Sequence, residues 1–110
     1  KASAGATAHL PIARVANIAQ TLRALKKAKI WIFGADVGEG TIPYSKADLT
    51  RDAALVIGAE GAGLSAVVRK ECDYLVRIPT VGKVASLNAS VAAGILLYEA
   101  VRQRGAGKDA

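Results

Sequence analysis

The chain has 110 residues, of which 52% are hydrophobic and 22% charged, so it can bury a core, and an intrinsically disordered chain is excluded. Its formal net charge of +6 favours an anionic partner such as nucleic acid. No run approaches the roughly 18 apolar residues of a membrane span, and the lone Cys72, without a second cysteine or a cluster of metal ligands, favours a reducing, cytoplasmic location.

The first predicted element is a helix that begins at Val15. Apolar residues recur there at spacings of three and four, which is the period of a helix with one buried side. These residues are Val15, Ile18, Ala19, Leu22 and Leu25. Lys26, Lys27 and Lys29 crowd the end of this helix, where the helix dipole favours cations. A solvated helix end explains these lysines at least as well as a contact with RNA.

Three short runs of apolar and β-favouring residues predict strands at residues 30–33, 53–57 and 74–78. The first run does not alternate, which is typical of a strand covered on both faces in a parallel sheet, and Gly34 is expected to end it. Residues 36–46 contain two glycines and a proline and are predicted as a loop. A short helix after residue 64 is expected to carry Arg69 and Lys70 outward.

The last helix is predicted over residues 89–102, followed by a polar tail. Leu87, Val91, Ile95 and Tyr98 line one side, and further apolar residues cover much of the rest. A helix that is apolar nearly all round must be buried, so we expect one side to meet a second copy in a homodimer. The order helix, strand, loop, strand, helix, strand, helix predicts an α/β fold with a mainly parallel sheet flanked by helices.

Two glycine-bearing loops, residues 58–65 and 78–88, each leave a predicted strand and enter a predicted helix. In open α/β sheets, ligands bind outside the carboxyl ends of the strands. Glycine at such a place permits unusual backbone angles and a close approach of the backbone to a ligand. For the first loop alone, a plain turn between strand and helix is an equally good interpretation, but two such loops favour a ligand site.

Several familiar chemistries do not fit these loops. The order Gly58-x-x-Gly61-x-Gly63 differs from the dinucleotide-binding pattern, and no Gly-Lys-Ser/Thr phosphate loop occurs. The only histidine, His9, precedes a proline and is interpreted as a loop residue, so no Ser-His-acid set is formed. What remains is a pocket lined by backbone, with apolar walls, that suits a ligand with an adenine ring. Its polar side chains are Glu60, Ser86 and Asn88, and its apolar walls are Ile78, Val81 and Leu87.

The stretch from Gly58 to Ser65, followed by Ile78 to Asn88 and the helix start Ala-Ser-Val-Ala-Ala-Gly-Ile, closely resembles the last two motifs of a known family. This family is the SpoU-type (TrmH-like) RNA ribose 2′-O-methyltransferases of the SPOUT superfamily. The resemblance extends to Lys1–Ala6 and to the helix around Asn17, and thus spans nearly the whole chain. It is greatest for the branch that methylates a guanosine of large-subunit rRNA, with a tRNA enzyme of the same family as the alternative.

The resemblance implies a fold whose C-terminal stretch forms a deep trefoil knot, a feature almost absent from other proteins. It implies S-adenosylmethionine as cofactor and a homodimer as the assembly. By position, the cofactor contacts are Gly58, Gly61, Ile78, Val81, Gly82 and Leu87. The residues beside the reacting ribose are Glu60, Ser86 and Asn88, and no metal is implied.

One part of the family pattern is not found in these 110 residues. The family's first motif carries an Asn and a later Arg on a strand-turn-helix, and nothing around Arg14 matches it. We therefore expect residues 1–103 to be the C-terminal portion of the methyltransferase domain, with one or more N-terminal strands missing, and residues 104–110 to be a polar tail. Two other classes stay open, namely a nucleotide-binding protein or oxidoreductase and a non-catalytic RNA-binding or dimerisation module.

Overall fold

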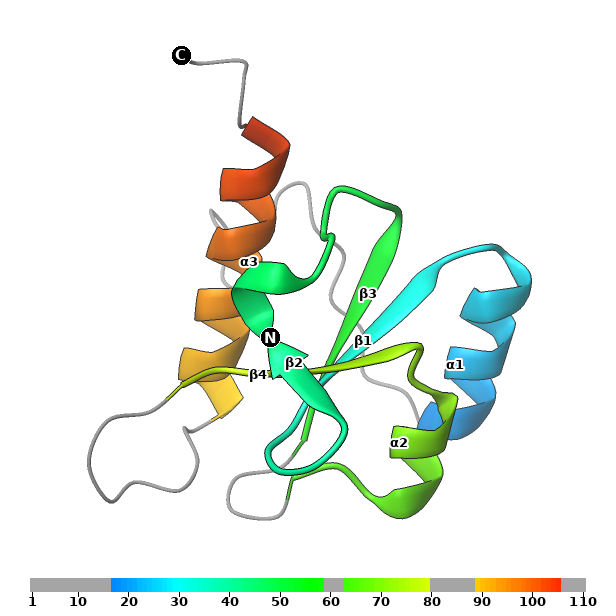
Figure 1. The fold of residues 1–110 in the computed structure, drawn as a ribbon. Coiled ribbons are helices and arrows are strands. Elements are labelled where there is room, and N and C mark those ends of the chain that lie inside the picture. The colour runs from blue at the N-terminus through cyan, green and yellow to red at the C-terminus, as the bar shows by residue number, and fades with distance from the viewer. Residues whose placement is uncertain (1–16, 59–62, 80–88, 106–110) are drawn as a thin grey trace.

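A computed structural model describes residues 17–58, 63–79 and 89–105 of the chain (Figure 1). Its centre is a four-stranded sheet with the strand order β2-β4-β1-β3, in which every pair of neighbours is parallel. The strands are β1 (Trp31–Ala35), β2 (Thr41–Pro43), β3 (Ala53–Ile57) and β4 (Tyr74–Arg77). The predicted α/β class with a parallel sheet is confirmed.

Helices cover both faces of this sheet (Figure 1). Helices α1 (Ile18–Lys27) and α2 (Ala66–Glu71) lie on one face, whereas α3 (Ala89–Gly105) and the short 3-10 helix η1 (Tyr44–Lys46) lie on the other. Each face has its own core. The core under α1 and α2 consists of Leu22, Ile32, Val56 and Val68, and the core under α3 consists of Phe33, Ala47, Leu49, Val76 and Leu96.

Strand β1 is central and is covered on both faces, as its unbroken apolar run predicted. Consecutive side chains of a strand point to opposite faces, and here Ile32 belongs to the core under α1 and α2, while Phe33 belongs to the core under α3. Both side chains are fully buried. The same alternation holds in β3, where Val56 packs with Ile32 and Leu55 packs against the cluster around Phe33.

The prediction that Gly34 ends this strand is wrong. The strand continues to Ala35, and Gly34 pairs with Val56 on one side and Leu75 on the other. A Cβ at Gly34 would lie 2.5 Å from the Sγ of Cys72 and 2.7 Å from the Cδ1 of Leu64. Glycine is therefore required here because the side chains around α2 pack directly on the backbone of the strand.

Two further boundaries differ from the predictions. The loop predicted at residues 36–46 contains strand β2 and helix η1. Helix α1 begins after Asn17, whose side chain accepts a hydrogen bond from the backbone N–H of Gln20, while Val15 lies outside the described residues. Ile18 is largely exposed, so the buried stripe of α1 centres on Leu22.

The predicted end of the last helix at Arg102 is wrong, because α3 continues to Gly105. Two residues of its last turn bind the segment before β3: Gln103 donates to the carbonyl of Ala47 and accepts from the N–H of Leu49, and Arg104 donates to the carbonyl of Leu49. The last turn of α3 thus anchors the connection between η1 and β3. The domain limits, the knot and the additional N-terminal strands stay predictions, since the path of residues 80–88 lies outside the described residues.

Candidate functional site

The carboxyl ends of β4, β1 and β3 meet at one edge of the sheet, because these three neighbouring strands are parallel. Ala35 is in register with Ile57 and with Val76, so the residues that follow the strands stand side by side. These residues are Asp36 after β1, Gly58 after β3, and Ile78 after β4. A ligand site is expected at this carboxyl edge.

The two described ends of the first glycine loop, Gly58 and Gly63, lie against each other at this edge. A Cβ at Gly58 would lie 2.3 Å from the carbonyl oxygen of Gly63 and 2.5 Å from its carbonyl carbon, so no other residue fits at Gly58 without a shift. Gly63 has φ +68°, in the left-handed region that favours glycine. Contacts and backbone angles within the chain are therefore enough to explain the glycines at the two described ends of the loop. That this backbone also approaches a ligand stays a prediction.

A charged pair lies next to Gly63. The guanidinium of Arg69, on α2, donates from Nη1 to the Oδ2 of Asp36 and from Nη2 to the carbonyl of Glu39, 3.1 Å away. The prediction that Arg69 points outward is therefore wrong. Arg69 follows the buried Val68 on a short helix, so its position in the sequence predicts a side chain in solvent. Instead, the side chain of Arg69 lies over the carboxyl edge of the sheet, because it is paired with Asp36. The sequence signal that could have found this pair is an aspartate directly after a strand, at the predicted ligand edge.

Two of the predicted site residues lie in the described part of the chain. Gly58 and Ile78 follow β3 and β4, which flank β1, and both are half-buried at the carboxyl edge; Ile78 packs against the core under α3. The other predicted site residues lie outside the described residues, so how they meet stays a prediction. They are Glu60, Gly61, Val81, Gly82, Ser86, Leu87 and Asn88.

Other reactive groups of the described residues do not form a site. The thiol of Cys72 is half-buried and donates to the carbonyl of Val68, and its burial, with a smaller effect of the Asp73 charge, raises its pKa. Within residues 17–58, 63–79 and 89–105, histidine, cysteine and acidic residues form no group of three that could hold a metal ion. None of the helices in these ranges is long and apolar enough to cross a membrane.

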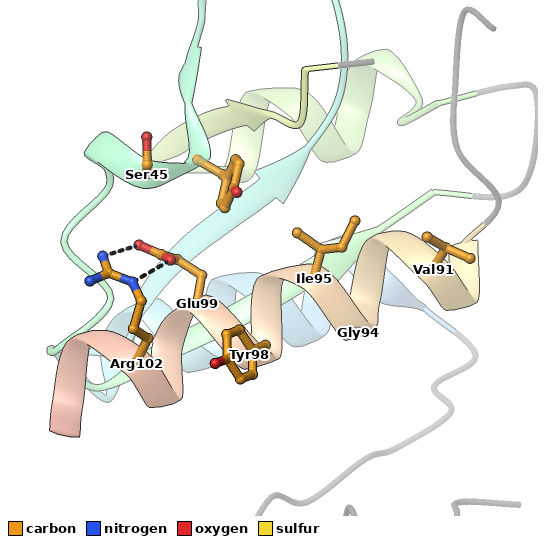
Figure 2. A pocket seen from close by; sticks show the side chains of 8 residues that line it. Ser45, Val91, Gly94, Ile95, Tyr98, Glu99 and Arg102 are labelled. Atoms are coloured by element: carbon orange, nitrogen blue, oxygen red, sulfur yellow. Dashed lines mark hydrogen bonds and ion pairs between the residues drawn. The ribbon is translucent and has the colours of Figure 1, made fainter. Parts of the chain in front are cut away.

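A second concave surface runs along α3, beside η1 (Figure 2). This groove of about 760 Å³ is lined by Tyr44, Ser45, Val91, Gly94, Ile95, Tyr98, Glu99 and Arg102. At its end Glu99 forms two hydrogen bonds with Arg102, of 2.8 and 2.9 Å, drawn in Figure 2. These bonds, with a further one from Gln103, lower the pKa of Glu99 to about 2, although the residue is only 5% exposed.

The apolar residues of α3 are divided between two sides. Ala92 and Leu96 face the sheet and are buried. Tyr98 is 71% exposed and Val101 is 57% exposed, on the side that faces away from the sheet. Helix α3 therefore exposes apolar side chains that the described residues of its own chain do not cover, and one of them, Tyr98, lines the groove.

The parallel sheet, with helices on both faces and the glycines of a strand-to-helix loop packed together at its carboxyl edge, defines an open α/β domain. The chain belongs to the SpoU rRNA Methylase family, whose model matches residues 1–98.

Named relatives and solved structures agree with this membership. The chain is 49% identical over 104 residues to the 23S rRNA (guanosine-2′-O-)-methyltransferase RlmB of Vibrio vulnificus, a match that covers 94% of the chain and 42% of that protein. It is 39% identical to the SpoU methyltransferase AviRb from Streptomyces viridochromogenes, solved in complex with the cofactor AdoMet, with a TM-score of 0.78 over 92% of the chain and 42% of that structure. The A. aeolicus TrmH/SpoU tRNA modifying enzyme gives a TM-score of 0.77 at 37% identity, over 82% of the chain and 46% of that structure. The chain thus spans less than half the length of each.

Proposed function

We propose that the protein is an S-adenosylmethionine-dependent RNA methyltransferase that transfers a methyl group to a ribose 2′-hydroxyl. The observation that carries this proposal is the closed glycine loop at Gly58 and Gly63, on the carboxyl edge of a sheet whose fold is shared with AviRb in its AdoMet complex. A basic chain, with a formal net charge of +6, suits RNA as the substrate.

The described part of the edge fits this cofactor. The two glycines leave backbone rather than side chains at the end of β3, and the half-buried Ile78 offers an apolar wall at the end of β4. An adenine ring needs such a wall together with backbone hydrogen-bond partners. In the proposed site Gly61, Val81, Gly82 and Leu87 complete the cofactor contacts.

When bound, S-adenosylmethionine supplies an activated methyl group on a sulfonium that carries its own leaving group, so the protein mainly has to position the reactants. A ribose hydroxyl is a poor nucleophile at neutral pH and needs a base or a stabilised alkoxide. Ser86 and Asn88 are proposed to orient the ribose, and Glu60 to hold a neighbouring cation by a charge-assisted hydrogen bond. An arginine outside this stretch is proposed to help deprotonate the ribose hydroxyl, since its positive charge stabilises the developing alkoxide.

The proposed substrate is a guanosine of large-subunit rRNA. This choice is supported by the 49% identity to RlmB, which is named a 23S rRNA guanosine methyltransferase. A tRNA substrate is the second candidate, supported by the 37% identity to the A. aeolicus tRNA modifying enzyme. A cytoplasmic location stays a prediction.

We also propose that the protein is a homodimer through α3. Support comes from the exposed Tyr98 and Val101 and from the groove beside them, since an apolar surface of this kind marks an interaction site. The two-sided apolar character of α3 is then explained, because one side packs on the sheet and the other packs on the second copy.

The proposed activity is tested by transfer of labelled methyl from S-adenosylmethionine to purified rRNA and tRNA. The 110-residue chain is compared with the full-length protein, meaning the complete protein that contains this stretch. We expect rRNA to be labelled by the full-length protein alone. In the full-length protein, Asn88→Ala should lower the rate about 100-fold, by analogy with the loss of an oxyanion-hole donor, and should weaken cofactor binding less. Robust turnover by the short chain would show that the arginine outside it is dispensable.

The rival classes give other results in the same protein. Selective binding of NAD in calorimetry, without binding of S-adenosylmethionine, would replace the proposal by a nucleotide-binding protein or oxidoreductase. Tight binding of RNA without affinity for either cofactor would replace it by a non-catalytic RNA-binding module.

A further inference from the structure

We propose that Asp36 and Arg69 are positioning residues that hold the C-terminal end of the first glycine loop in its cofactor-binding shape. This inference rests on the proposed function, because it assigns a role within the same cofactor site. The pair was absent from the site residues that the sequence indicated. It joins two segments at the carboxyl edge, namely helix α2 and the connection at residues 36–40, which directly follows β1.

Asp36 is held in one orientation by the sheet and by its own connection. Its backbone N–H donates to the carbonyl of Val76 in β4, 3.0 Å away, which continues the sheet by one residue. Its Oδ1 accepts from the N–H of Val37 at 2.8 Å, and its Oδ2 accepts from Arg69. The side chain is only 8% exposed. A carboxylate this buried is costly unless it is paired and hydrogen-bonded, and both requirements are met.

The same carboxylate fixes where Gly63 can lie. A Cβ at Gly63 would stand 2.8 Å from the Oδ1 of Asp36, so the glycine backbone passes directly against the carboxylate. Gly63 in turn lies against Gly58, at the point where a Cβ of Gly58 would meet the Gly63 carbonyl at 2.3 Å. Asp36 therefore supports Gly63 from one side, and Gly58 limits it from the other.

Arg69 connects Asp36 to α2, the helix that follows the first glycine loop. Helix α2 begins after Ser65, two residues beyond Gly63, and Ser65 caps it by accepting from the N–H of Val68. The guanidinium uses two nitrogens on two acceptors, the Asp36 carboxylate and the Glu39 carbonyl. A lysine offers a single charged nitrogen in place of this planar fork, so it can replace the arginine only in part.

The expected consequence is preorganisation. A ligand that binds one loop conformation has its apparent affinity reduced by the fraction of molecules in that conformation. Without the pair, α2 keeps its packing on β1 but loses the polar link across the carboxyl edge, so Gly63 is held less firmly and the end of the loop is expected to populate other conformations. Cofactor affinity should fall, whereas the rate at saturating cofactor should change little, because neither residue is assigned to the reacting groups.

The test is titration calorimetry of S-adenosylmethionine with the full-length protein and with Arg69→Met, Arg69→Lys and Asp36→Asn. We expect Arg69→Met and Asp36→Asn to raise Kd about tenfold, and Arg69→Lys to raise it less. The KM for the cofactor should rise in parallel, while kcat with rRNA should stay within about twofold. The matched control is Arg23→Met, which removes the 3.0 Å pair between Arg23 on α1 and Glu71, the last residue of α2. This pair lies on α2 but does not reach Asp36 or Gly63, so the Kd of the control should be unchanged.

The outcomes separate this inference from the proposed function. A wild-type protein that binds no S-adenosylmethionine overturns the proposed function and the inference together. Wild-type binding with an unchanged Kd in Asp36→Asn and Arg69→Met overturns the inference alone, and so does an equal loss in Arg23→Met, which would show that any disturbance of α2 suffices. If Arg69→Met does not fold, as judged by circular dichroism, Asp36→Asn decides by the same criteria, since it keeps the size of the side chain.

Discussion

Two regions of the molecule use glycine in opposite ways. At the carboxyl edge, Gly58 faces the Gly63 carbonyl, and a Cβ would lie 2.3 Å from its oxygen. On α3, Gly94 has no heavy atom within 4 Å of the place where a Cβ would stand. The backbone at the carboxyl edge is therefore fixed by contacts within this chain, whereas the outer side of α3 has room that the described residues of the chain do not fill.

Polar side chains also connect distant segments at the carboxyl edge and on the inner side of α3, but not on its outer side. Asp36 and Arg69 at the edge connect segments that are distant in sequence. On the inner side of α3, the half-buried Gln103 binds the connection before β3 and also donates to the buried Glu99, whereas the outer side of the helix presents Tyr98 and Val101. The comparison predicts that substitutions should harm the fold in proportion to how fully the position is enclosed by its own chain. Four substitutions test this relation, and they follow from the largest expected effect to the smallest.

The largest effect is expected for Gly58→Ala. The new methyl group would overlap the backbone of Gly63, and neither segment can move without disturbing the end of β3 or the support from Asp36. Overpacking of this kind costs about 3 kcal/mol, so the midpoint of urea unfolding should fall clearly. Gly105→Ala is the matched control, because nothing lies within 4 Å of its Cβ position. An equal, small effect of both substitutions would contradict the close approach at the carboxyl edge.

Features that depend on a local pattern of residues could be predicted from the sequence, whereas features that depend on contacts between distant residues could not. Strand β3 was predicted with its observed limits because its apolar run is local and continuous. Strand β2 was missed, since three residues that include Pro43 carry no periodic signal and become a strand only by pairing with β4. Likewise, the local sequence around Gly34 predicts a strand end. A glycine inside the strand is explained only by side chains that are distant in sequence, those of Leu64 and Cys72.

The same limit applies to the site. The glycines of the first loop were visible as a motif, and two of them, Gly58 and Gly63, have the backbone geometry that demands glycine. Asp36 and Arg69 were not predicted as partners, because the separation of 33 residues between them is closed only by the order of the strands. The second loop was predicted from its motif, and the described residues supply only its start, at Ile78.

The second largest loss of stability is expected for Gln103→Ala, on the inner side of α3. Gln103→Ala would leave the N–H of the buried Leu49 and the carbonyl of the buried Ala47 without their side-chain partner. Leaving such buried groups unsatisfied costs about 2 kcal/mol in the free energy of unfolding. Gln20→Ala, at an exposed position of α1, is the control and should change stability by less than about 0.5 kcal/mol. Similar stability of the two variants would show that the last turn of α3 does not anchor the connection before β3.

A third effect is a pH dependence from Glu99. Hydrogen bonds from Arg102 and Gln103 lower the pKa of Glu99 from 4.5 to about 2 in the folded chain. A lowered folded pKa stabilises the fold fully above pH 4.5, and this stabilisation is lost as the pH falls toward 2. Because the side chain of Arg102 is 55% exposed and solvent screens the pair, we expect about 1 kcal/mol.

The measurement is urea unfolding of the wild type and of Glu99→Gln between pH 7 and pH 2. The difference between them should be constant above pH 5 and should shrink below pH 4.5. A difference that does not change with pH would mean that the charge of Glu99 contributes nothing, and that only its packing matters.

The smallest effect on the fold is expected for Tyr98→Ser, on the outer side of α3. Tyr98 is 71% exposed, so in the 110-residue chain its loss should change the free energy of unfolding of the monomer by less than about 0.5 kcal/mol. Association is a different matter, because a partner that binds only the folded chain makes Tm depend on protein concentration. In the full-length protein we expect Tm to rise with concentration and sedimentation to show a dimer. Tyr98→Ser should weaken both signals, whereas Gln20→Ala should leave them unchanged. If the wild type sediments as a monomer at micromolar concentration, the outer side of α3 has another use, and the room around Gly94 is not explained by a second copy of this chain.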